Sequence, residues 1–90
     1  MDRLFEAVLE LESADDCYAF FEDLCTVGEL HAMAQRFAVA ERLDQGLHYQ
    51  EIASETGAST ATISRVKRCL EYGADGYRSV LDRLKDAATE

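Results

Sequence analysis

In this 90-residue chain, the residues best suited to binding chemistry lie between Ser59 and Arg68. Small polar side chains stand there beside basic residues. If this stretch is helical, Ile63, Val66 and Leu70 recur at helical spacing and form one apolar stripe. The opposite face then offers small side chains that can approach the edges of DNA bases in a major groove. It also offers basic side chains that can reach phosphates. We therefore predict a DNA-binding face made of Ser59, Thr60, Ala61, Ser64, Arg65, Lys67 and Arg68.

The stretch 49–72 has the pattern of a helix-turn-helix, which would position this face. Ile52 and Ala53 fall on the inner side of a short first helix, and Gly57 follows where the chain must turn sharply with a positive φ. Ser59 can cap the second helix with its hydroxyl oxygen. The small side chain of Ala53 permits the close helix crossing that this motif needs. A helical hairpin that only closes a small bundle, or that binds another protein, is the alternative.

Periodic apolar residues and capping signals continue along the rest of the chain. Ser13 with Asp16 resembles a capping box, Thr26 with Glu29 forms a complete one, and Asp75 can cap a last helix. We predict an all-α fold of six helices without strands. Its parts, in a single domain over 1–90, are two acidic helices within 1–25 (2–12 and 14–25), a long central helix over 27–45, the helix-turn-helix over 49–72 and a last helix over 76–88.

The second acidic helix carries an unusual share of aromatic area. Tyr18, Phe20 and Phe21 are three of the eight aromatic residues in the chain. A small acidic hairpin with so much apolar area suggests a surface that is buried against something else. We interpret residues 1–25 as dimerisation helices, with a cover over the core of the same chain as the alternative.

The net charge of −9 is not spread evenly. Residues 1–25 carry eight acids and one base, residues 26–70 carry five of each, and residues 71–90 carry five acids and three bases. Most of the negative charge is therefore separated in sequence from the helix-turn-helix. Acidic residues outside the motif can orient the protein on DNA, and they predict weak non-specific DNA affinity. Because no stretch resembles a signal peptide or a membrane span, we expect a cytoplasmic protein.

Catalysis and metal binding find no support in the sequence. Cys17, Cys25 and Cys69 lack the CxxC spacing of metal sites, and neither histidine stands near them in sequence. There is no Gly-rich phosphate loop and no HExxH motif. We therefore expect no metal site and no catalytic residue, so the protein should not be an enzyme.

Several features together resemble a known family over residues 24–72. They are Thr26 with Glu29, Arg36 on the long helix, Gly46 at its end, Gln50, Gly57-Ala58 and the run Ala61-Thr62-Ile63-Ser64-Arg65. With these the chain resembles the Trp repressor superfamily, and within it the small YerC/YecD-like branch. The resemblance implies a six-helix fold in an intertwined homodimer. Two recognition helices would then enter successive major grooves of a palindromic operator, about 34–36 Å apart, as in the Trp repressor itself.

The resemblance also implies roles for individual residues. The positions that match DNA-contacting positions of the family are Gln50, Thr60, Ala61, Thr62 and Ser64. Glu51 departs from the pattern because the Trp repressor has a basic residue there. A carboxylate that faces DNA would accept a hydrogen bond from a cytosine amino group, so we expect an operator different from that of the Trp repressor.

A tryptophan pocket is the least well matched part of the resemblance. Thr26, Arg36 and Arg65 match residues of that pocket in the repressor. Val66, however, stands where the repressor has glycine, and its side chain would fill the space that the indole needs. We therefore expect no cofactor and no response to tryptophan, while another small-molecule effector stays open.

Taken together, these patterns predict a sequence-specific DNA-binding transcriptional regulator. We expect a homodimeric repressor that binds a palindromic operator on double-stranded DNA through the second helix of its helix-turn-helix. Two alternatives stay open: a protein-interaction adaptor that uses the same hairpin as a binding surface, and a repressor that responds to a small ligand.

Overall fold

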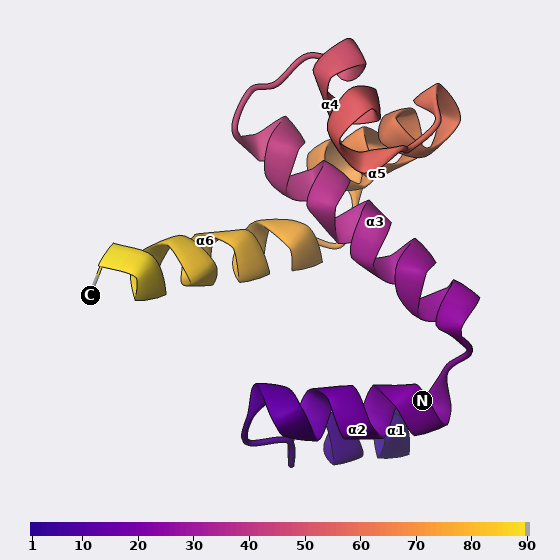
Figure 1. The fold of residues 1–90 in the computed structure, drawn as a ribbon. Helices are drawn as coiled ribbons and strands as arrows, with labels where there is room; N and C mark the ends of the chain where they lie inside the picture. The colour runs from indigo at the N-terminus through magenta and orange to yellow at the C-terminus, as the bar shows by residue number, and fades with distance from the viewer. Residues whose placement is uncertain (90) are drawn as a thin grey trace. The chain divides into compact units, whose positions relative to one another are not determined.

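The computed structural model describes residues 1–89, over which the chain forms six helices and no strand (Figure 1). The helices are α1 (Asp2–Val8), α2 (Ala14–Leu24), α3 (Val27–Asp44), α4 (Tyr49–Thr56), α5 (Thr60–Tyr72) and α6 (Gly76–Thr89). The predicted all-α fold is confirmed. None of the helices in the described part of the chain is long and apolar enough to cross a membrane. The chain divides into two compact units, residues 1–32 and residues 33 onward.

The complete capping box forms as predicted. Glu29 N–H donates to Thr26 Oγ1 at 3.1 Å, and Thr26 N–H donates to Glu29 Oε1 at 2.9 Å. The bond from the Thr26 backbone, with that of its side chain, lowers the pKa of the Glu29 carboxyl. At Ser13 only half of a box forms, because the shorter Asp16 carboxylate accepts from Glu12 N–H instead of Ser13 N–H.

The first helix is shorter than predicted. It ends at Val8, because Glu10 and Leu11 N–H donate three residues back, to Ala7 and Val8 carbonyls, and tighten the last turn. Leu9, which falls within the predicted span 2–12, lies outside α1 and is 83% exposed.

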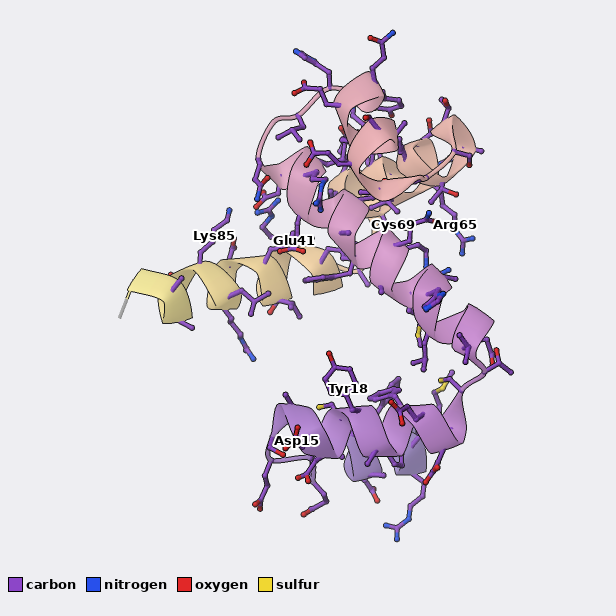
Figure 2. The ribbon with its side chains drawn as sticks, viewed as in Figure 1. Asp15, Tyr18, Glu41, Arg65, Cys69 and Lys85 are labelled. Carbon is purple, nitrogen blue, oxygen red and sulfur yellow. The ribbon has the colours of Figure 1, made fainter. Side chains whose placement is uncertain are left out.

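The unit of residues 1–32 has no fully buried residue. Phe20 and Phe21 pack edge to face with ring centroids 5.5 Å apart, and both are only half-buried. Tyr18 is 69% exposed and projects from α2 (Figure 2). This unit therefore lacks a core of its own.

The unit from residue 33 onward has one apolar core, to which every helix from α3 to α6 contributes. Its buried members are Val39, Ala40, Ile52, Ala58, Ile63, Val66 and Leu81. Half-buried Phe37, Leu43, Tyr49 and Leu70 are among the side chains that pack against it. Only the C-terminal half of α3 contributes fully buried residues to this core, Val39 and Ala40.

The last helix is tied to the end of α3 by charge. The Asp44 carboxylate accepts from Lys85 Nζ at 2.6 Å and from Arg78 Nη2 at 2.7 Å. The hydrogen bond from Lys85, and after it the one from Arg78, lowers the pKa of the Asp44 carboxyl below its usual value. Figure 2 shows Lys85 where α6 passes the C-terminal half of α3. Asp75, predicted to cap α6 through its side chain, does so through its carbonyl, which accepts from Ser79 N–H at 3.0 Å, and its φ is 64°.

Candidate nucleic-acid interface

The turn between α4 and α5 is fixed by backbone geometry and by three hydrogen bonds. Gly57 has a φ of 74°, where a side chain would be strained, and its N–H donates to the Ala53 carbonyl at 2.9 Å. The Thr56 hydroxyl accepts from Ala58 N–H at 3.2 Å, and Gln35 of α3 donates to the Thr56 carbonyl at 3.2 Å. The helix-turn-helix is thus held to the long helix as well as to itself.

The start of α5 is capped as its sequence predicted. The Ser59 hydroxyl accepts from Thr62 N–H at 3.2 Å and lies 3.1 Å from Thr62 Oγ1. Thr62 is half-buried, unlike the other predicted DNA contacts. Both side chains therefore act in the helix cap, which presents the residues that follow.

The predicted DNA face is exposed and lies on one side of α5. At about 100° per residue its positions cover roughly half of the helix circumference. The opposite side carries Ile63 and Val66, at 0% and 1% exposure. The exposed members on α5 are Thr60, Ala61, Ser64, Arg65, Lys67 and Arg68. Gln50 is exposed in the first turn of the neighbouring helix α4.

The bases of α5 carry uncompensated charge. Arg65, Lys67 and Arg68 form no ion pair with any residue that the structure describes, and Arg65 extends from the α5 ribbon (Figure 2). Four other bases are paired with carboxylates at 2.6–3.2 Å, namely Arg3, Arg42, Arg78 and Lys85. Of the five bases without an ion pair in the described part of the chain, these three lie together on α5, while Arg36 lies on α3 and Arg83 on α6.

The Glu51 carboxylate has a structural partner. Its Oε1 accepts from His48 N–H at 3.1 Å at the start of α4, where the partial positive charge of a helix N-terminus favours an acid. In this arrangement one oxygen of the carboxylate serves the helix cap.

The positions suggested for a ligand pocket are occupied in three different ways. Val66 belongs to the buried core, as a helix-turn-helix without a ligand requires. Thr26 Oγ1 is used in the capping box of α3. Arg36 is half-buried on α3 and Arg65 is exposed on α5. Among residues 1–89 no group of His, Cys, Asp or Glu is placed to hold a metal ion, and Cys17, Cys25 and Cys69 are free thiols.

One residue of this surface was missed in the sequence. Tyr49 opens α4, and its hydroxyl accepts from Ser64 Oγ at 3.5 Å. Lys67 Nζ lies 5.8 Å from the centroid of its ring. The contacts span 15 and 18 positions of the chain, so no local pattern could have pointed to them.

Comparison with known proteins gives matches over most or all of the chain. The family described as Trp repressor protein matches residues 1–85. The uncharacterized protein YerC of Bacillus subtilis (strain 168) is 54% identical over 90 residues, which are 100% of this chain and 86% of that protein.

Two solved structures superpose closely. A TrpR-like protein of Eubacterium eligens ATCC 27750 has a TM-score of 0.91 at 52% identity, over 93% of this chain and 87% of that one. A Staphylococcus aureus protein of known crystal structure has the same TM-score at 54% identity, over 93% of this chain and 84% of that one.

Proposed function

This chain belongs to the Trp repressor family, whose members are regulatory DNA-binding proteins and not enzymes, and we propose that it is a sequence-specific transcriptional repressor. The observation that carries the proposal is the surface of α5. Three unpaired bases stand there beside small polar side chains, opposite a fully buried stripe.

In the proposed mechanism α5 enters a major groove. Thr60, Ala61 and Ser64 lie near its N-terminal end, where short side chains let the helix approach base edges closely. Arg65 and Arg68 reach the phosphates on either side and set the register. Bound in this way at a promoter, the protein would exclude the transcription machinery from the same DNA.

A homodimer with a palindromic operator follows from the same proposal. The unit of residues 1–32 exposes large apolar side chains and has no buried residue, so it needs a partner surface. We propose that a second copy supplies it. The two α5 helices would then read half-sites about one helical turn apart.

We further propose that the repressor acts in the cytoplasm and needs no tryptophan. Val66 fills the position that a bound indole would require and contributes to the core instead. Arg65 is then a phosphate contact, and Arg36 is an ordinary half-buried arginine of α3.

A protein-interaction adaptor is the second candidate, and the net charge of −9 favours it. Titration with salt separates the two. Contacts to phosphate release counterions, so DNA affinity should fall at least tenfold between about 50 and 200 mM salt. An apolar protein interface would hardly respond, and a purified protein that binds no duplex at about 50 mM salt would favour the adaptor.

A further inference from the structure

We propose that Tyr49 is a positioning residue of the DNA interface, which holds Lys67 of α5 ready for the phosphate backbone and fixes Ser64 beside it. The inference rests on the proposed function and adds to it a residue of α4. Tyr49 was not among the predicted DNA contacts. It connects the two helices of the motif on their exposed side.

The geometry gives Tyr49 two contacts on α5. Lys67 Nζ lies 5.8 Å from its ring centroid, within the range of a cation–π interaction, and Ser64 Oγ lies 3.5 Å from its hydroxyl oxygen. Ser64 and Lys67 are three positions apart, so they share one face of α5. Tyr49 itself is half-buried and packs against the core, which gives it a fixed position.

The acids near Lys67 do not hold it. Asp44 borders the same hollow as Lys67, but its carboxylate already accepts from Arg78 at 2.7 Å and Lys85 at 2.6 Å. Glu71 follows Lys67 by four positions, yet no ion pair joins them in the described part of the chain. The Tyr49 ring is therefore the group that restrains the Lys67 side chain.

This restraint leaves the lysine able to bind an anion. A ring attracts an ammonium group without neutralising its charge, whereas a carboxylate would cancel it. An open hollow of about 630 Å³ is lined by Lys67 together with Ser64, Arg68, Glu71 and Tyr72. A phosphate can thus approach a lysine whose side chain is already ordered, so less conformational entropy is lost on binding.

The test is a double-mutant cycle on DNA binding with Tyr49→Leu and Lys67→Met. The probe is a duplex of about 30 base pairs, long enough for two half-sites and enriched by the wild-type protein from a random-sequence pool. Lys67→Met removes one phosphate contact from each protomer of the dimer, so it should weaken binding and reduce the steepness of log affinity against log salt by about 1.8. Tyr49→Leu should weaken binding about two- to fivefold in wild type, but hardly at all when Lys67 is already methionine.

Arg68 provides the matched control, because it stands next to Lys67 and forms no hydrogen bond or cation–π contact with Tyr49 among the described residues. A cycle of Tyr49→Leu with Arg68→Met should be additive. Equal coupling to Lys67 and Arg68, or none to Lys67, would overturn the inference while DNA binding itself stands. If the wild-type protein enriches no duplex, the inference fails together with the proposed function.

A measurement on the wild-type protein covers the case in which Tyr49→Leu does not fold. Lys67 and Lys85 are the two lysines of the chain. Because Lys67 lies over an aromatic ring, its ε-methylene protons should resonate upfield of those of Lys85 in a proton–carbon spectrum. Identical shifts for the two lysines would show that the ring does not hold Lys67 and would overturn the inference.

Discussion

The most informative residues of this protein are the basic residues of α5, because three of them lie together on one exposed face and form no ion pair in the described chain. The sequence alone does not distinguish them from basic residues that form internal ion pairs, such as Arg78 and Lys85. Helical period separated the exposed face from Ile63 and Val66, and this separation is correct in the structure. The role of Tyr49 could not be predicted, because its contacts depend on how α4 crosses α5.

Arg65→Ala and Arg68→Ala should each weaken DNA binding about tenfold, because each removes a phosphate contact. The melting temperature should hardly change, since neither side chain forms an ion pair in the described chain. Arg83→Ala is the matched control. It removes the same charge from α6, outside the proposed interface, and should leave binding close to wild type. Equal losses of melting temperature and affinity for Arg65 and Arg68 would contradict their assignment.

Tryptophan should leave both DNA affinity and melting temperature unchanged, because we expect the Val66 side chain, which stands where the Trp repressor has glycine and is 1% exposed, to exclude an indole. A ligand at about 100 times its dissociation constant would stabilise the fold by about 2.7 kcal/mol, which thermal melting detects readily. A rise in melting temperature with tryptophan, accompanied by tighter DNA binding, would refute the steric argument.

At the scale of elements, capping chemistry was the most reliable guide to where helices begin. Thr26 with Glu29 and Ser59 at α5 formed the predicted bonds. Helix ends were less predictable. Periodic leucines extended the first predicted helix to residue 12, but α1 ends at Val8, because periodicity does not report whether a side chain finds anything to pack against.

The turn of the helix-turn-helix depends on Gly57. Gly57→Ala should lower the free energy of unfolding by about 1–2 kcal/mol, because the φ of 74° is unfavourable for a residue with a Cβ. Gly76→Ala is the control, since a Cβ there meets no atom within 4 Å and its φ is not positive. Chemical denaturation should show loss for the first variant and none for the second. Equal effects would mean that the turn does not depend on φ.

The link between α3 and α6 predicts a dependence on pH. The pKa of Asp44 is lowered in the folded state, so its stabilising effect is fully present above the unfolded pKa and disappears as pH falls through the folded pKa. Asp44→Asn should therefore lower the melting temperature at pH 7 and not at about pH 2, below both pKa values.

Asp23→Asn is the control for this pH series. Asp23 is an exposed acid on α2 without an ion pair in the described chain, so the substitution should have little effect at pH 7. A deficit of Asp44→Asn that persists undiminished at about pH 2 would show that the carboxylate charge does not stabilise the contact.

At the scale of the whole molecule, charge and burial divide the chain in the same place. Residues 1–32 carry nine acids and one base and bury no residue, whereas residues 33–90 carry nine acids and eight bases and contain the core. Composition predicted the separation of charge, and the aromatic cluster indicated that residues 1–25 need a partner. Which surface covers them depends on a second chain, and the sequence of one chain does not specify its geometry.

This division suits a regulator that binds DNA only at chosen sites. Under the proposed function, repulsion between the acidic unit and phosphate would reduce binding to arbitrary DNA, so affinity would depend on the match between α5 and a specific groove. Because most of the excess negative charge lies in residues 1–32, a chain with net charge −9 can still belong to a DNA-binding family.

The central claim is that this protein reads a palindromic DNA site as a dimer without an effector. Selection of random duplex DNA by the purified protein, at about 100 mM salt and with no added small molecule, tests it most directly. The account predicts an enriched palindrome whose half-sites are centred about one helical turn, 10–10.5 base pairs, apart. Enrichment of a single unrepeated half-site would contradict the dimer, and no enrichment at all would contradict effector-free DNA recognition.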